Sequence, residues 1–125
     1  MKVDATEVEL NGIKCVRADS ADSNAKAKQV DGMDYVIVRT YSAGVFAGYL
    51  KKQDGKHVTL LNARRLWFWK GAATLSQLAT DGVSCPNECK FPCEVASIDL
   101  TEAIEVISTT IQAQQSIAKV KLWTA

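Results

Sequence analysis

The sequence predicts an α+β fold: a twisted antiparallel β-sheet with two short helices in one small domain. Three observations predict it. Runs rich in β-branched residues alternate with polar turns, two short segments each follow a threonine that can cap a helix, and 125 residues are the length of one domain. We expect an N-terminal hairpin and linker at residues 1–33 and a core that contains the functional residues at 34–125.

The N-terminal part should contain one hairpin. Residues 8–19 hold the dipeptide Asn11-Gly12 between apolar positions. Asn-Gly favours a type I′ turn because both central positions need a positive φ. Residues 20–29 are polar and rich in Ala, Ser and Lys, which is typical of a linker or a short exposed helix.

The middle of the chain reads as consecutive strands. Residues 35–39 are nearly all apolar and mostly β-branched, as in a central strand that is buried on both faces. Residues 45–51 form the next strand, in which Gly48 indicates a bulge or a close approach of another backbone. A turn at 53–56 leads into a strand at 57–61, and residues 63–69 form another strand or its continuation.

The C-terminal half supplies both helices. Thr74 can cap a helix at residues 75–80, which ends at Asp81-Gly82, and Thr110 can cap a second helix at residues 111–118. Between them lie a loop with two prolines at 84–92 and two strands, 93–100 and 102–108. Residues 120–123 should end the chain as a strand.

Composition limits the partners. The net charge is +1, which argues against binding to DNA or RNA polymers because these need an extended basic face. One compact anionic ligand needs only a local cluster of cations. No apolar run has the roughly 18 residues of a membrane span, and the first ten residues are acidic where a signal peptide would be apolar. We therefore expect a cytoplasmic protein with reduced thiols and no membrane partner.

The strongest functional signal is Arg64-Arg65 before three aromatic residues. Guanidinium groups bind phosphate through paired hydrogen bonds and stack on flat rings. Along a strand, alternation should place the side chains on two faces: Arg65, Trp67 and Trp69 on one, and Arg64, Leu66 and Phe68 on the other. The alternative is that the tryptophans anchor the core or an interface, with Arg65 stacked on one of them.

Other motifs give weaker signals for chemistry. Cys85, Cys89 and Cys93 could bind zinc with His57, although His57 is distant in sequence, and three small loop thiols are the simpler interpretation. An iron–sulfur radical enzyme would need a large barrel, which this chain lacks. His57 could act as a base, but no motif supplies it with a partner, so an exposed strand-edge histidine is favoured.

The turn at residues 42–44 is also open to more than one interpretation. The full G-x-S-x-G pattern of a nucleophile turn is absent around Ser42-Ala43-Gly44, and no strand-to-helix step follows. Its backbone N–H groups could face an anionic ligand, and an ordinary bulge is the simplest interpretation. We therefore expect no enzyme, no cofactor and no metal.

Several ordered motifs resemble those of the phage-encoded Thoeris anti-defence proteins of the first sponge family. The resemblance runs from Tyr35 to Trp123 and rests on residues 38–48, 62–66, 69, 71–72, 75–79, 98–102, 104–105, 107, 116–117, 120 and 123. The N-terminal hairpin belongs to it less clearly. The family implies that the protein tightly binds a cyclic ADP-ribose isomer made by bacterial TIR enzymes and does not cleave it, so that the infected host's defence is not triggered.

The resemblance also implies partners and sites. Members form dimers or hexamers, place the cyclic ADP-ribose pocket between protomers, and in some cases also hold cyclic di- and trinucleotides. For this chain we predict six ligand-binding residues: Arg39, Tyr41, Ser42, Arg64, Arg65 and Phe91, the last as a stacking ring. The loop cysteines are not part of the family pattern. The main rival function is an interaction module of a phage particle; a small hydrolase using His57 is a weaker one.

Overall fold

The computed structural model describes residues 25–124, so the hairpin predicted at 8–19 lies outside the described residues. Its five strands are β1 (Tyr35–Thr40), β2 (Val45–Asp54), β3 (His57–Arg65), β4 (Glu94–Leu100) and β5 (Ala103–Ser108). Its helices are α1 (Leu75–Asp81), the 3₁₀ turn η2 (Pro86–Glu88) and α2 (Ile111–Lys119). The predicted α+β fold is confirmed: one small domain with an antiparallel sheet and two helices.

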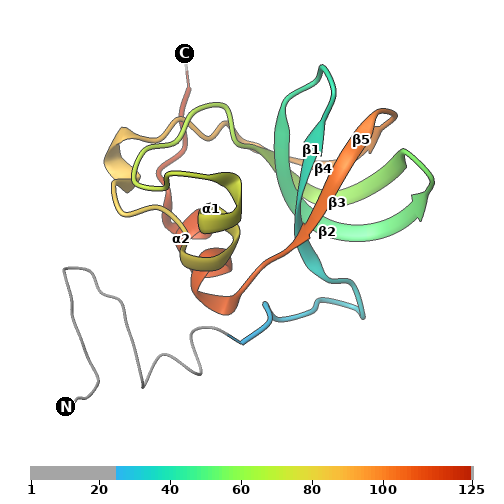
Figure 1. The fold of residues 1–125 in the computed structure, drawn as a ribbon, viewed down its shortest axis with the longest axis horizontal. Coiled ribbons are helices and arrows are strands. Elements are labelled where there is room, and N and C mark those ends of the chain that lie inside the picture. The colour runs from blue at the N-terminus through green and yellow to red at the C-terminus, as the bar shows by residue number, and fades with distance from the viewer. Residues whose placement is uncertain (1–24, 125) are drawn as a thin grey trace.

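The sheet has the strand order β4-β3-β2-β1-β5 and every neighbouring pair is antiparallel. The two edge strands, β4 and β5, are consecutive in the chain and joined by only two residues. The sheet must therefore coil until its edges meet at one end, as Figure 1 shows. Two backbone hydrogen bonds close that end, from Ala103 N–H to the Lys56 carbonyl and from Tyr41 N–H to the Glu102 carbonyl.

Each face of the sheet buries its own apolar cluster. The inside of the coil is filled by residues such as Val36, Val38, Phe46 and Leu60. The other face is covered by α1 and α2 (Figure 1), and its cluster includes Ile37, Leu66, Leu78, Phe91 and Ile117. Strand β1 contributes alternate residues to both clusters, which confirms the prediction of a strand buried on both faces, although Arg39 is exposed.

Both predicted caps are present. The Thr74 side chain accepts a hydrogen bond from the N–H of Gln77, and the Thr110 side chain accepts one from the N–H of Ala113. These bonds satisfy backbone donors that the first helical turn leaves free. Within residues 25–124 no helix is long and apolar enough to cross a membrane.

Gly48 has the role that its position predicted. The β2–β3 ladder is irregular between Ala47 and Tyr49, where Asn62 adopts a φ of 51°. A Cβ atom at Gly48 would lie 3.1 Å from the Ala63 Cα. The two backbones therefore approach closely, and a side chain at Gly48 would require its neighbours to move by a few tenths of an ångström.

Three local predictions are wrong. Strand β3 continues through Ala63 but ends at Arg65 instead of Trp69. Residues 120–123 form no strand; Leu122 makes an isolated parallel bridge with Phe91. Of the two alternatives for residues 20–29, the helix is wrong for the described residues 25–29, which fit the linker; Lys26 forms a bridge with Thr110 that holds this segment along the start of α2.

Candidate functional site

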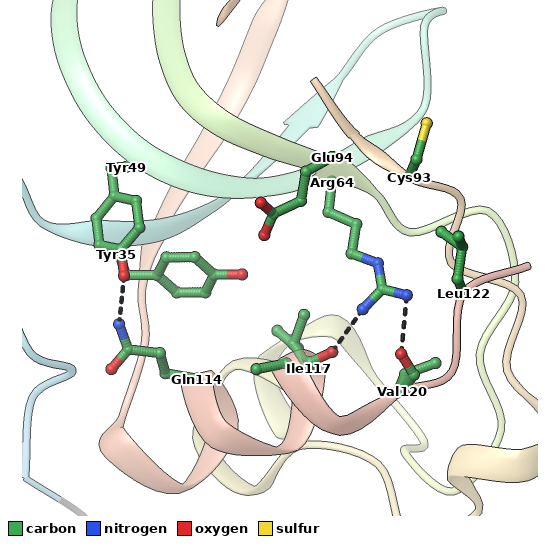
Figure 2. A pocket seen from close by; sticks show the side chains of 10 residues that line it. Tyr35, Tyr49, Arg64, Cys93, Glu94, Gln114, Ile117, Val120 and Leu122 are labelled. Atoms are coloured by element: carbon green, nitrogen blue, oxygen red, sulfur yellow. Dashed lines mark hydrogen bonds between the residues drawn. The ribbon is translucent and has the colours of Figure 1, made fainter. Parts of the chain in front are cut away.

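One hollow among the described residues is a pocket between the helix-covered face of the sheet and α2 (Figure 2). It has a volume of about 420 Å³. The polar side chains that line it are Tyr35, Tyr49, Arg64, Glu94 and Gln114, and the apolar ones include Ile117, Val120 and Leu122. A few polar groups converging on a partly apolar hollow is the usual composition of a ligand site.

The sheet register brings the polar residues together. Tyr35 of β1 is directly opposite Tyr49 of β2, and Arg64 of β3 is directly opposite Glu94 of β4. Directly opposed residues share a face. Between these two pairs lies Ala47, which is opposite Arg64 on the other side. Because alanine is small, the sheet is hollowed between the tyrosines and the Arg64–Glu94 pair.

The Arg64 guanidinium is part of the structural framework. Its Nε donates to the Pro92 carbonyl at 2.9 Å, and its Nη1 to the Ile117 carbonyl at 2.9 Å. Its Nη2 donates to the carbonyls of Phe91 at 3.1 Å and Val120 at 2.8 Å. The carbonyls of 117 and 120 lie at the C-terminal end of α2, where backbone acceptors lack helical partners and a cation is favoured. Arg64 thus ties the sheet to α2 and to the loop before β4.

Burial lowers the pKa of Arg64, and the neighbouring Tyr35 and Glu94 partly oppose that change. With 7% of its surface exposed, the guanidinium stays charged because its hydrogen bonds replace water. It also lies 5.4 Å from the centre of the Phe91 ring. Arg64 therefore carries a positive charge, but most of its N–H donors already bind backbone carbonyls.

Tyr35 places a hydroxyl inside the pocket that has no hydrogen-bond partner among residues 25–124. The residue is 7% exposed, and Figure 2 shows its hydroxyl pointing into the hollow. Burial raises the pKa of this hydroxyl, and the nearby Glu94 and Tyr49 raise it further. No side chain among the described residues lowers the pKa through a hydrogen bond. A buried hydroxyl without a partner is costly, and none of the described residues satisfies this one, so it is open to a ligand group.

Tyr49 and Gln114 form the wall across the hollow from Arg64 (Figure 2). The Tyr49 ring packs edge-on against Tyr35 with ring centres 5.0 Å apart. Its hydroxyl accepts a hydrogen bond from Gln114 Nε2 at 3.1 Å (Figure 2). Gln114 also accepts from the Lys28 N–H and donates to the Lys28 carbonyl. The amide is therefore held in place, and the O–H of Tyr49 remains available to donate.

Arg39, Tyr41 and Ser42 lie together at the β1–β2 turn, away from the pocket. We call them, with Glu102 and Glu105, the turn cluster. Arg39 Nε donates to Glu105 at 2.7 Å, and Ser42 Oγ donates to Glu102 at 2.7 Å. The Tyr41 side chain is 79% exposed. The cluster has one arginine and two carboxylates, so an anion would have to compete with Glu105 for the arginine.

The other predicted ligand contacts lie elsewhere. Arg65 is on the face opposite Arg64, with its guanidinium 4.7 Å from the centre of the Phe46 ring. Phe91 is 0% exposed in the core below the helices, so its ring offers no face to a ligand. The six predicted residues therefore do not form one site within a single chain, and of these only Arg64 lines the pocket.

The aromatic residues after β3 do not share a face as predicted. Trp69 packs against the core, whereas Trp67 is 63% exposed and stacks on Trp123. Their ring centres are 6.5 Å apart and their planes are 12° from parallel. Phe68, Leu122 and Lys90 complete this aromatic surface; the Lys90 ammonium lies 5.7 Å from the Trp123 ring. Alternation fails here because the strand ends at Arg65.

The cysteines and His57 are also separated. Cys85 is half-buried, Cys89 buried and Cys93 exposed, all as free thiols. His57, at the β2–β3 turn, lies 3.6 Å from Asp99. In the part of the chain that the structure describes, no three His, Cys, Asp or Glu side chains are grouped as metal ligands.

A family described as "Domain of unknown function (DUF6948)" matches residues 33–117. The chain belongs to this family. No curated protein and no solved structure matches the chain. The DUF6948 match includes all five polar residues that line the pocket, and it ends before Val120, Leu122 and Trp123. The pocket's polar lining thus lies within the matched residues, and the tail beyond them adds one apolar wall.

Sequence reasoning missed four residues of the pocket: Tyr35, Tyr49, Glu94 and Gln114. Their signals are present but ambiguous. Tyr35 begins the most hydrophobic strand, and Glu94 is a lone carboxylate beside Cys93. Only the pairing of β1 with β2 and of β3 with β4 shows that these side chains meet.

Proposed function

We propose that this DUF6948 protein is a phage anti-defence sponge, which binds cyclic nucleotide immune signals and holds them without cleavage. The signals would be glycocyclic ADP-ribose isomers from TIR enzymes, with cyclic di- or trinucleotides as further ligands. The observation that carries the proposal is the pocket with an arginine, two tyrosine rings and a buried hydroxyl that has no partner among the described residues. The resemblance to Thoeris anti-defence proteins supplies the ligand class and the absence of turnover.

The size of the pocket is that of a small-molecule site. Ligand pockets span about 300–1,000 Å³, and this one has about 420 Å³. A cyclic ADP-ribose isomer holds two riboses, a base and two phosphates, and the resemblance implies that its pocket lies between protomers. We propose that a second copy of the chain, in a dimer or in a hexamer built from dimers, contacts part of the ligand.

The test combines calorimetry with mass spectrometry. The protein is titrated with a panel of cyclic ADP-ribose isomers and cyclic oligonucleotides, and bound ligand is then released by heat and weighed. Release of intact ligand supports the sponge. Altered ligand means an enzyme, such as the hydrolase using His57, and no binding to any ligand of the panel overturns the proposal.

A matched pair of variants on α2 ties binding to the pocket. Ala118 lines the pocket, whereas Gln115 is exposed on the same helix outside it. Ala118→Phe should fill the hollow and reduce binding at least tenfold, while Gln115→Phe should leave binding unchanged. Equal binding by both variants would place the ligand elsewhere on the protein.

One observation favours a second function, an interaction module of a phage particle. The aromatic surface exposes Trp67, Phe68, Leu122 and Trp123 together, and exposed aromatic residues are enriched at protein interfaces. A module of this kind would bind no ligand of the panel. Trp67→Ser would then abolish its association with a partner while leaving the fold intact.

A further inference from the structure

The free hydrogen-bonding groups of the pocket are unlike those of a phosphate site. Four of the five N–H groups of Arg64 donate to backbone carbonyls. A phosphate needs several converging donors, and Arg64 has one left. The guanidinium therefore supplies positive potential to the pocket but cannot grip a phosphate through the usual paired hydrogen bonds.

Glu94 makes the pocket less suitable still for an anion. It is opposite Arg64 in the β3–β4 ladder, and Figure 2 shows its carboxylate directed toward the hollow. An ionised carboxylate only accepts hydrogen bonds. A phosphate beside it would meet a like charge, whereas a hydroxyl or an N–H would meet an acceptor.

The remaining free groups are two tyrosine hydroxyls. That of Tyr35 has no partner among the described residues, and that of Tyr49 accepts from Gln114 and keeps its own proton to donate. A ligand that carries several hydroxyls can both accept from the tyrosines and donate to Glu94. The apolar side chains of Ile117, Val120 and Leu122 can pack against its C–H groups.

From these groups, and resting on the proposed function, we infer that the pocket binds a ribose of the ligand and that the phosphates lie outside it. Glu94 accepts hydrogen bonds from the ribose hydroxyls, as acidic residues do in dinucleotide sites. Tyr35 and Tyr49 donate to the sugar oxygens. Arg64 holds the walls of the pocket in place and offsets the charge of Glu94.

The first test needs no variant. Adenosine, 2′,3′-dideoxyadenosine and inorganic phosphate are titrated into the parent protein by calorimetry. We expect adenosine to bind at least tenfold more tightly than the dideoxy compound, since one hydrogen bond to a charged group is worth roughly ten- to a hundredfold in affinity. Equal binding of both nucleosides, or phosphate competing with adenosine, would overturn the ribose assignment.

The second test uses a charge-matched pair. Glu94→Gln and Glu88→Gln remove the same charge, but Glu88 lies outside the pocket and pairs with Lys70. Glu94→Gln should weaken binding of ribose-bearing ligands at least tenfold, and Glu88→Gln should not. Tighter binding by Glu94→Gln would indicate a phosphate in the pocket. If this variant does not fold, the nucleoside comparison on the parent protein still decides.

The two proposals fail in different ways. If the parent protein binds a cyclic nucleotide of the panel but Glu94→Gln and the dideoxy substitution change nothing, the ribose assignment is wrong and the sponge stands. If the parent binds no nucleotide and no nucleoside, the proposed function falls together with this inference.

Discussion

Arg64 and Arg65 are adjacent in the chain, but they serve two different regions of the molecule. Arg64 faces the helix-covered side, is 7% exposed and donates to four carbonyl oxygens. Arg65 faces the other side, is exposed, and lies over the Phe46 ring. The covering layer makes the difference, because α2 and the loop before β4 bring their carbonyls to Arg64 only.

The contrast shows how burial determines which polar groups are free to bind a ligand. On the helix-covered side, each polar group must find a partner, so Arg64 is bound to the framework and the unpartnered Tyr35 hydroxyl stands out. On the other side, water can hydrogen-bond to the exposed Arg65, so the position of this arginine does not indicate a ligand site. The pocket is thus defined by what the framework leaves unpaired.

The largest expected effect is at Arg64. Arg64→Met keeps the stem but leaves four carbonyls without their donor, so we expect the free energy of unfolding to fall by about 3–5 kcal/mol. Urea denaturation followed by circular dichroism measures it. Arg65→Met is the matched control and should cost less than about 1 kcal/mol, the value of an exposed cation–π contact. Equal losses would contradict the contrast between the two sides.

A second contrast concerns space around two glycines with positive φ. Gly82 has a φ of 78°, and a Cβ there would lie 2.3 Å from the Ser116 Cβ on α2. Gly44, in the β1–β2 turn, has a φ of 107° and nothing within 4 Å of its Cβ position. Gly82→Ala should therefore cost about 3–4 kcal/mol, from both strain and a clash.

Gly44→Ala should cost about 1–2 kcal/mol from backbone strain alone. Thermal unfolding of the two variants under the same conditions compares them. A loss at Gly44 as large as that at Gly82 would show that the helix layer is not the more tightly packed region.

The sequence predicted local features better than the places where segments meet. The strand at Tyr35, the bulge at Gly48 and the caps at Thr74 and Thr110 follow from residue types and their spacing, and all are present. These features depend on a few neighbouring residues, so a single chain reveals them.

The pocket and the tail depend on distant contacts, which is why they were missed. The separation of Arg64 from Arg65 was predicted by alternation, but the role of Arg64 depends on carbonyls at 117 and 120, more than fifty residues away. Trp69 packs against the core because β3 ends at Arg65. The residues after α2 form one isolated bridge, between Leu122 and Phe91, and do not pair as a strand. No local pattern contains this information.

The caps give the next smaller effect. Thr74 and Thr110 each accept a hydrogen bond from a backbone N–H, and Thr110 also donates to the Thr80 carbonyl. Thr74→Ala should cost about 1 kcal/mol, and Thr110→Ala should cost about 1 kcal/mol more because it also loses the bond between the helices. Urea titrations with matched slopes measure both; a larger loss at Thr74 would contradict this order.

The smallest effect on stability is expected in the turn cluster. The Arg39–Glu105 pair is about half exposed on both sides, and such pairs contribute about 0.2–1 kcal/mol. Arg39→Ala should therefore lower the free energy of unfolding by less than about 1 kcal/mol, and less still in high salt.

If Arg39 binds a ligand phosphate, it must first leave Glu105, so Arg39→Ala should lower the affinity for the ligand by less than about tenfold. Glu105→Gln should then strengthen binding because it frees the arginine. Calorimetry with a cyclic ADP-ribose isomer tests both variants, and unchanged affinity in both would show that the turn cluster does not contact the ligand.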